Sequence, residues 1–142
     1  MTVRTILSSK GHQIASVDPD VHLAAAIKVL AERKIGALLV MAKERIEGII
    51  SERDIVRAVA ADGARALDEP VRKFMTRDVV TCSRADTVAA IMERMTEGKF
   101  RHLPVVDEGA VVGVISIGDV VKYRVMEFER EQEALRDYIK TA

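Results

Sequence analysis

The chain contains two copies of one sequence pattern, and this repeat constrains its fold more than any other feature. Residues 48–54 are echoed by residues 113–119, an offset of 65, and the register holds without a gap from Val17 against Cys82 to Val59 against Arg124. A repeat of this length is a supersecondary unit that buries its apolar face against its copy. Eleven residues are identical in the two copies: Ala24, Ala25, Glu32, Lys34, Leu38, Val40, Gly48, Ile50, Ser51, Asp54 and Val56 each recur 65 positions later.

The composition is that of an ordinary globular protein. The 142 residues, 49% hydrophobic and 31% charged, suffice for one domain or for two half-size repeats that share a core. Lys plus Arg equals Asp plus Glu at 22 each, which gives no reason to expect nucleic-acid binding. No apolar run reaches the ~18 residues of a membrane span, and the N-terminus lacks the apolar stretch of a signal peptide. With Cys82 as its single cysteine, the chain is expected in the cytoplasm, away from membranes.

Hydrophobic periodicity and turn residues predict strand, helix, strand, strand, helix in each copy, a mixed α/β (α+β) fold. In the first copy we expect strands over 13–17, 37–41 and 46–50, with helices from 21 to just before Gly36 and over 51–61. In the second we expect strands over 78–82, 101–106 and 111–115, with helices over 86–97 and from 116 onward. Short helices over 2–8 and 71–75 precede the two copies. The predicted division is repeat 1 at 1–62, a linker at 63–70, repeat 2 at 71–125 and a helical extension at 126–142.

Two features of the second copy have no counterpart in the first. Pro104 lies inside the strand over 101–106, and because proline lacks an N–H, that strand is expected at a sheet edge or with its unpaired side facing a ligand. The last helix continues through residues 126–140, with apolar side chains among many charged ones. Two readings of this extension stay open: a helix packed on its own domain, or a helix that contacts a partner or a second copy of the chain.

In both copies an apolar strand ends in serine, and an aspartate follows three residues later in the first turn of a helix. The pairs are Ser51 with Asp54 and Ser116 with Asp119. For one pair alone the simplest interpretation is capping, in which serine accepts from an early backbone N–H and the carboxylate complements the helix dipole. The same groups suit a nucleoside phosphate, because helix-start N–H groups attract phosphate and a carboxylate can accept from both ribose hydroxyls.

The flanking residues favour the nucleotide interpretation and differ between the copies. In the first copy Gly36 lets a flat base approach the backbone, and Arg53 supplies a cation for phosphate. In the second copy, Arg101 occupies the position equivalent to Gly36 and is followed by His102. Gly118 occupies the position equivalent to Arg53. A solvated strand end is the alternative reading of Arg101 and His102. If the halves pack around a pseudo-twofold axis, each pocket can borrow groups from the other half, and the two pockets are expected to be unequal.

These residues give the chain a resemblance to tandem cystathionine-β-synthase (CBS) domain pairs, also called Bateman modules. The resemblance covers about residues 3–125 and is specific through the order and doubling of the motifs rather than through any one of them. The matching segments are residues 48–54 and 113–119, the strand segments 36–40 and 101–106, and Phe74-Met75-Thr76 before the second repeat.

The resemblance implies two β-α-β-β-α repeats packed sheet to sheet around a pseudo-twofold axis, with two clefts that bind adenosine compounds. AMP is the first expectation, with ATP, ADP, NAD(H) or S-adenosylmethionine as alternatives, and no catalytic cofactor is expected. Stand-alone pairs of this family usually form homodimers shaped as a flat disc. The departure at Gly118 puts equal occupancy of the two clefts in doubt. The implied nucleotide-binding residues are Ala15, Ser16, Gly36, Ala37, Leu38, Ser51, Arg53, Asp54, Thr81, Cys82, Arg101, His102, Leu103, Pro104, Ser116 and Asp119.

The leading hypothesis is therefore a sensor that binds an adenine nucleotide, regulates an unidentified partner and catalyses nothing. The alternative is a structural or interaction protein in which both pairs act only as caps and the C-terminal helix makes the contacts. An enzyme has little support, because the sequence has neither a nucleophile elbow nor a zinc-helix motif. Cys82 fits a small apolar filler better than a nucleophile. His12, His22 and His102 lie at unrelated spacings, so no metal site is expected.

Overall fold

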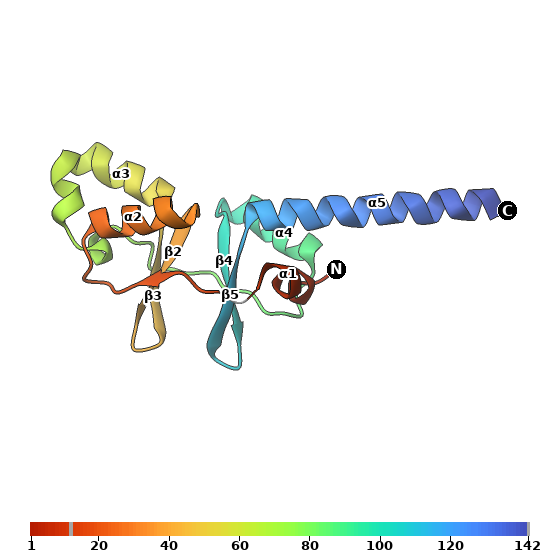
Figure 1. Ribbon diagram of the computed structural model, residues 1–142, viewed down its shortest axis with the longest axis horizontal. Coiled ribbons are helices and arrows are strands. Elements are labelled where there is room, and N and C mark those ends of the chain that lie inside the picture. The colour runs from red at the N-terminus through yellow and green to blue at the C-terminus, as the bar shows by residue number, and fades with distance from the viewer. Residues whose placement is uncertain (12, 142) are drawn as a thin grey trace. The chain divides into compact units, whose positions relative to one another are not determined.

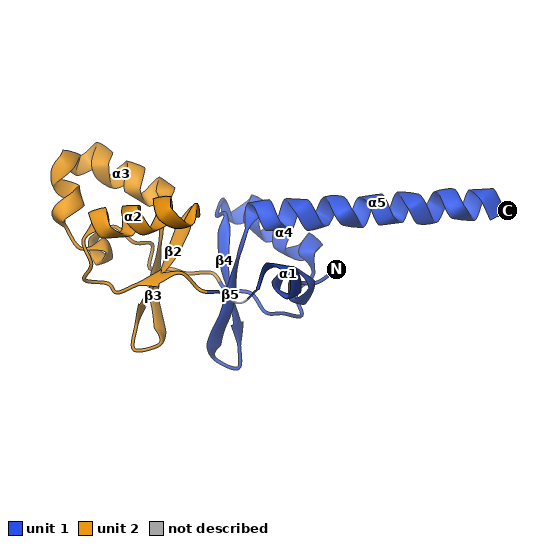
Figure 2. Cartoon of the chain, viewed as in Figure 1, with its two compact units in different colours: residues 1–13, 81–142 blue, residues 14–80 orange. Residues whose placement is uncertain are grey.

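The chain folds into two compact units that do not follow the order of the sequence (Figure 2). The computed structural model describes residues 1–11 and 13–141, so His12 and Ala142 lie outside the described residues. Unit 1 combines Met1–Gln13 with Thr81–Ala142, and unit 2 is Ile14–Val80. The two units are described separately below.

Unit 2 is a three-stranded sheet covered by helices. Its strands are β1 (Ser16–Val17), β2 (Ala37–Ala42) and β3 (Arg45–Ser51), in the order β1-β2-β3, with β1 parallel and β3 antiparallel to β2. Figure 1 shows α2 (Leu23–Arg33) and α3 (Glu52–Asp62) on one side of β2 and β3. The 3₁₀ helices η1 (Gly63–Asp68) and η2 (Val71–Lys73) complete the unit.

The core of unit 2 explains why the apolar run of β2 has no alternation. The residues from Ala37 to Val40 are all buried, so both faces of this strand are covered. Leu23, Ala26 and Leu30 of α2 are buried at helical spacing and pack in the same core. The predicted buried strand and amphipathic helix are therefore confirmed.

Unit 1 repeats this arrangement with fewer strands. The antiparallel pair β4 (His102–Asp107) and β5 (Ala110–Ser116) is accompanied by α1 (Val3–Lys10), α4 (Val88–Gly98) and α5 (Ile117–Thr141). Its core gathers Leu103, Val105 and Ile115 of the strands with Val88 and Ile91 of α4. The resulting element order confirms the predicted mixed α/β class with a long C-terminal helix.

The segment before each repeat packs with the other repeat. Val3, Ile6 and Leu7 of α1, which precedes the first repeat, are at most 1% exposed in the core of unit 1. Main-chain bonds fix α1 there, from Val3 N–H to the Asp86 carbonyl (2.9 Å) and from Val88 N–H to the Met1 carbonyl (3.0 Å). The expected boundaries at 62 and 71 follow the sequence repeat, whereas the compact units follow this packing.

The segment before the second repeat packs with the first repeat in the same way. Val71 of η2 and Met75 are buried in the core of unit 2. Val71 donates its N–H to the Val21 carbonyl (2.9 Å), and Leu23 donates its N–H to the Glu69 carbonyl (2.9 Å). Residues 63–68 and 71–73 therefore form two 3₁₀ helices, whereas the sequence predicts a linker over 63–70 and a short helix over 71–75.

The glycine shared by the two copies makes room for these segments. A Cβ on Gly48 would lie 2.7 Å from both Met75 Sδ and the Thr76 carbonyl oxygen. A Cβ on Gly113 would lie 2.6 Å from Leu7 Cδ2. Both distances are shorter than real Cβ contacts allow, so each glycine permits a close approach that the sequence repeat alone does not explain.

The strand predicted over 78–82 is wrong, and Pro104 gives the physical reason. In unit 2, Leu39 donates its N–H to the Ala15 carbonyl (3.1 Å), which helps to hold β1 beside β2. Pro104 occupies the place of Leu39 and has no N–H. Only Cys82 pairs with β4, donating to the Pro104 carbonyl (3.0 Å) and accepting from Val106 N–H (2.9 Å).

Several element boundaries also differ from expectation. The first strand shortens from 13–17 to Ser16–Val17. The helix expected from 21 begins at Leu23, and the helix expected from 86 begins at Val88, where the Thr87 hydroxyl accepts from Ala90 N–H at 3.1 Å. Thr2 stands at the N-cap of α1 without a side-chain cap bond. These shifts arise because turns and single caps set helix starts, and apolar periodicity locates them only approximately.

Candidate functional site

Ser51 and Asp54 form a complete capping box at the start of α3. Ser51 donates both its N–H (2.9 Å) and its hydroxyl (2.9 Å) to Asp54 Oδ2, and Asp54 N–H donates back to Ser51 Oγ at 3.4 Å. The prediction that this pair caps a helix is therefore confirmed. The carboxylate is nevertheless unusual, because Asp54 is only 9% exposed and is the buried charged residue of the described core.

A third group reaches the Asp54 carboxylate from the segment before the second repeat. The Thr76 hydroxyl donates to Asp54 Oδ1 at 3.1 Å, and Thr76 exchanges two main-chain bonds of 2.9 Å with Ile49 of β3. Three hydrogen bonds thus hold a buried carboxylate, which has about four lone-pair positions. A ligand hydroxyl could donate to a remaining lone pair of the Asp54 carboxylate, which Ser51 and Thr76 already hold in place.

Ser116 and Asp119 repeat the same box at the start of α5. Ser116 donates its N–H (2.9 Å) and hydroxyl (3.1 Å) to Asp119 Oδ2, and Asp119 N–H donates to Ser116 Oγ at 3.2 Å. Here the additional donor is a cation. Lys10, the last residue of α1, places its ammonium 2.6 Å from Asp119 Oδ2 and 2.9 Å from the Val114 carbonyl.

The lysine changes the electrostatics of the second pair. Partial burial raises the pKa of Asp119, but the hydrogen bond from Lys10 and the N–H of Ser116 outweigh burial and hold the pKa below its usual value of 3.8. Asp119 is therefore a carboxylate already paired with a cation at neutral pH.

Main-chain pairing brings the expected strand-start residues next to these boxes. In unit 2, Ala37 lies opposite Ser51, and the Gly36 carbonyl accepts from Glu52 N–H at 3.0 Å. In unit 1, His102 lies opposite Ser116, and the Arg101 carbonyl accepts from Ile117 N–H at 2.8 Å. Within each unit the strand start and the helix start thus lie side by side.

The remaining expected residues lie at the same end of each sheet or are buried in it. Ser16 lies opposite Leu39, and the Ala15 carbonyl bonds to Leu39, two residues from Ala37. Leu38, Leu103 and Pro104 are buried as whole residues, so the structure leaves little of their backbone or side chains accessible to a ligand. The Thr81 carbonyl already accepts from Arg94 at 2.8 Å.

The cations differ between the units as the sequence indicates. Arg53 is exposed in the first turn of α3, and Arg101 is exposed just before β4. A Cβ on Gly118, which replaces Arg53 in the second copy, would meet only Ser116 Oγ at 3.6 Å. The first turn of α5 therefore has space for a side chain that this sequence omits.

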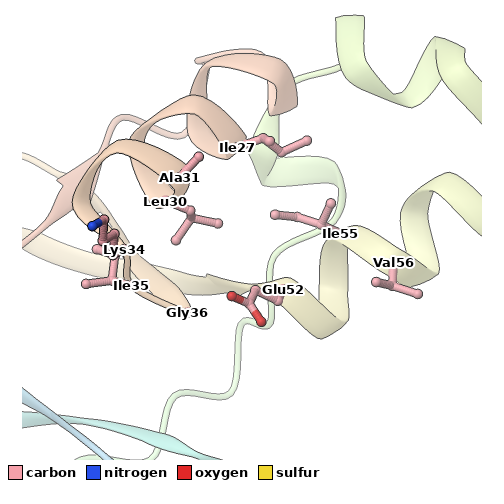
Figure 3. Close-up of a pocket in the computed structure, with 9 residues that line it drawn as sticks. All are labelled: Ile27, Leu30, Ala31, Lys34, Ile35, Gly36, Glu52, Ile55 and Val56. Atoms are coloured by element: carbon pink, nitrogen blue, oxygen red, sulfur yellow. The ribbon is translucent and has the colours of Figure 1, made fainter.

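A surface hollow of about 600 Å³ lies beside the site of unit 2 (Figure 3). Its walls are apolar side chains of α2 and α3, including Leu30 and Ile55, and Lys34 and Glu52 bring opposite charges to it. Of the residues expected to bind nucleotide, Gly36 lines the hollow, whereas Ser51 and Asp54 do not. The hollow therefore adjoins the capping box through Gly36 and Glu52 without enclosing it.

Cys82 lies in the core of unit 1 rather than in a reactive position. Burial, with Asp86 acting in the same direction, raises the pKa of its thiol to about 12, so at neutral pH the sulfur is an apolar packing group. Across residues 1–11 and 13–141, no three acidic, histidine or cysteine side chains gather closely enough to hold a metal ion. Within the same residues, no helix combines the length and apolarity that crossing a membrane requires.

Sequence reasoning did not identify Thr76 and Lys10 as site residues. The signal for them was the resemblance between residues 3–7 and 71–75, because Thr76 directly follows the second segment and Lys10 lies three residues beyond the first. That each segment packs with the other repeat is a long-range property. It therefore required the structure.

Comparisons with known proteins agree on one family. The CBS domain model matches residues 3–61 and again residues 71–125. A CBS domain-containing protein from Agrobacterium tumefaciens is similar in structure, with a TM-score of 0.86 and 44% identity, over 87% of this chain and 99% of that one. A mitochondrial CBS domain-containing protein of Arabidopsis thaliana is 30% identical over 98% of this chain and 72% of its own length.

A third similar protein was solved with a ligand. It is a CBS domain protein from Pyrobaculum aerophilum complexed with AMP, with a TM-score of 0.74 and 28% identity, over 84% of this chain and 89% of that one. The doubled strand-to-helix motif, the two serine–aspartate boxes and these matches lead to one assignment. The chain belongs to the CBS domain family and carries a tandem pair of these domains.

Proposed function

We propose that this chain is a regulatory module that binds an adenosine nucleotide, with AMP as the first candidate, and that it catalyses no reaction itself. The observation that carries the proposal is the buried Asp54 carboxylate, held at a helix start by Ser51 and Thr76 beside the backbone of Gly36. The AMP complex of the Pyrobaculum aerophilum relative supports this choice of ligand.

Each part of the nucleotide has a candidate partner in unit 2. The ribose hydroxyls donate to Asp54, the phosphate accepts from Ser51 and from helix-start N–H groups with Arg53 as its cation, and the base lies against the backbone at Ala15, Ser16, Gly36, Ala37 and Leu38. In unit 1 the corresponding groups are Asp119 and Ser116 with Arg101 and His102, beside the backbone at Thr81, Cys82, Leu103 and Pro104.

In this proposal the site of unit 2 binds the nucleotide more tightly than the site of unit 1. A ligand at Asp119 competes with the Lys10 ammonium, 2.6 Å from the carboxylate, whereas Thr76 gives Asp54 a neutral donor. A nucleotide that binds one conformation of the chain more tightly raises the population of that conformation. The size of this shift is limited by the difference between the nucleotide's affinities for the two conformations. ATP, ADP, NAD(H) and S-adenosylmethionine are the alternative ligands of the same site.

Isothermal titration calorimetry tests the proposal directly. AMP, ATP, NADH and S-adenosylmethionine are titrated against the wild-type chain, Asp54→Asn and Asp119→Asn, with the exposed Asp137→Asn as a matched control on α5. We expect binding to the wild type and the control, a loss of at least tenfold for Asp54→Asn and a smaller loss for Asp119→Asn. If none of the four compounds binds below the millimolar range, the proposal is overturned; unchanged binding in both site variants removes the site assignment.

A second candidate function is that of a structural or interaction protein without a nucleotide. It is favoured by the completeness of both capping boxes, since each serine and aspartate already satisfies the other. In that case nucleotides leave the melting temperature unchanged, because a ligand that does not bind the folded state cannot stabilise it. Deletion of residues 126–142 would then abolish assembly, while nucleotide binding would be absent throughout.

A further inference from the structure

Most of the exposed apolar surface of the described chain lies on one helix. Among residues 1–11 and 13–141, nine large hydrophobic side chains are exposed, and six of them belong to α5: Val121, Val125, Phe128, Leu135, Tyr138 and Ile139. From Phe128 onward every described residue of α5 is exposed, and Figure 2 shows the helix projecting beyond the other elements of unit 1. An unsupported helix of this length is marginal in water unless its apolar side packs against something.

Five of these exposed apolar side chains follow a heptad pattern, and Gln132 occupies the one remaining position of the pattern. The positions alternate in steps of four and three residues, which gives the average period of 3.5 that keeps a seam facing a partner helix. We call this set of positions the seam; it consists of Val121, Val125, Phe128, Gln132, Leu135 and Ile139. In heptad terms Val125, Gln132 and Ile139 occupy a positions, and the other three occupy d positions.

The seam is not the side of α5 that packs on unit 1. The buried residues of this helix are Val120 and Tyr123, and the Tyr123 hydroxyl contacts Ser9 of α1. At 3.6 residues per turn, the seam lies roughly a third of a turn away from them around the helix. The first turns of α5 can therefore stay docked on unit 1 while the seam receives a second helix.

The charges beside the seam match a second copy in parallel orientation. In a parallel pair each g residue faces the e residue of the next heptad on the partner helix. In α5 this brings Arg124 against Glu129 and Glu131 against Arg136, twice each by symmetry, and all four contacts join opposite charges. Within one chain Arg124 lies 3.3 Å from Glu127 and stacks on Phe128 at 4.4 Å, so the Glu131–Arg136 contacts are expected to contribute more.

Gln132 adds a further argument for a two-stranded pair. A single polar residue at an a position lowers stability and fixes register and strand number, because its side chain is satisfied only opposite its own copy. Here it lies between the apolar layers of Phe128 and Leu135. One polar layer flanked by apolar layers is therefore compatible with a helix pair of defined register.

We propose that α5 forms a parallel two-stranded coiled coil with α5 of a second copy of this chain, joined along the seam and oriented by Glu131 and Arg136 of each copy. This surface is separate from the proposed nucleotide site and does not depend on it. It corresponds to the second reading of the extension, a helix that contacts a second copy of the chain.

Disulfide trapping in the full chain tests both contact and orientation. In a parallel pair Ile139→Cys, at an a position, lies beside its own copy, whereas in an antiparallel pair it faces the other end of the seam. We expect rapid oxidation of Ile139→Cys to a covalent dimer, and at least about tenfold slower oxidation when Leu135→Glu is added. Asp137→Cys, on the outer side of the helix, and the wild type, whose Cys82 is buried, are matched controls. A chain that is monomeric at micromolar concentration, or a dimer without this disulfide, overturns the proposal.

Charge reversal tests the pairing itself. Glu131→Arg and Arg136→Glu each place like charges opposite each other in a parallel pair, and each is expected to raise the dimer dissociation constant roughly tenfold. The double variant restores opposite charges and is expected to return to the wild-type value. Mixing the two single variants is expected to give the mixed dimer preferentially. Failure of the double variant to recover overturns the parallel arrangement, because the two reversed charges face each other only when the helices run in the same direction.

Discussion

Units 2 and 1 contain the same serine–aspartate box and differ in what completes it. In unit 2 the neutral hydroxyl of Thr76 bonds to a buried Asp54, whereas in unit 1 the ammonium of Lys10 pairs with Asp119, whose side chain is 24% exposed. The box itself belongs to the repeat, but its third donor comes from the segment before the other repeat. The two boxes therefore share their geometry, and the leading segments add to the differences that Arg53 and Gly118 already make between the two sites.

The largest expected effect concerns the glycines under those segments. Gly48→Ala is expected to lower the free energy of unfolding by about 1–3 kcal/mol, because the new methyl group meets the Thr76 carbonyl and Met75 at 2.7 Å and the backbone must shift. Gly113→Ala is expected to cost less, since its obstacle is the end of the Leu7 side chain. Urea unfolding followed by circular dichroism measures both; an equal or larger cost at Gly113 would contradict the comparison.

A smaller effect is expected from exchanging the cations of the two sites. Gly118→Arg should strengthen AMP binding in unit 1 about fivefold, because it restores a guanidinium at a position with open space around its Cβ. Gly118→Gln, which adds length without charge, is the matched control, and Arg53→Gln should weaken unit 2 by a similar factor. Calorimetry at two salt concentrations checks the result, because a charge effect shrinks with salt. Equal gains with arginine and glutamine would contradict it.

The smallest effect on stability is expected at Lys10. Lys10→Gln removes the charge that lowers the pKa of Asp119, so this pKa should rise towards 3.8, as an NMR titration of the carboxyl can measure. Because folding lowers this pKa, the pair stabilises the fold fully above pH 3.8, and its contribution is lost as the pH falls through the lower folded value. At neutral pH the variant should lose less than about 1 kcal/mol, since both side chains are partly exposed. An unchanged Asp119 pKa would show that Lys10 is not the partner in solution.

Local features of the fold could be predicted from the sequence because the repeat reports them twice. The buried run of β2, the helical spacing of α2 and the serine that starts α3 each have a counterpart 65 residues later. The strand expected before α4 failed for a non-local reason, since the proline that removes its bond lies in β4, more than 20 residues away along the chain. The hydrophobic pattern of a segment does not show whether the neighbouring strand can offer it a main-chain hydrogen bond.

The candidate site could be predicted only in part for the same reason. Ser51, Asp54 and their copies lie within single turns, so spacing alone places them together. Thr76 and Lys10 reach the carboxylates because α1 and η2 pack with the opposite repeats, a choice that depends on Gly48, Gly113 and the cores around them. Residues that join a site through tertiary packing leave only weak traces in one sequence.

The most direct test of the account is an AMP titration of the ¹⁵N-labelled chain, followed at the amides of Ser51 and Ser116. Both N–H groups donate to the aspartates proposed to bind ribose, so each reports its own site. We predict that the Ser51 amide shifts and saturates below millimolar AMP, and that the Ser116 amide follows at higher concentration. If neither amide moves, or if Ser116 saturates first, the proposed nucleotide site or its ranking between the two units is wrong.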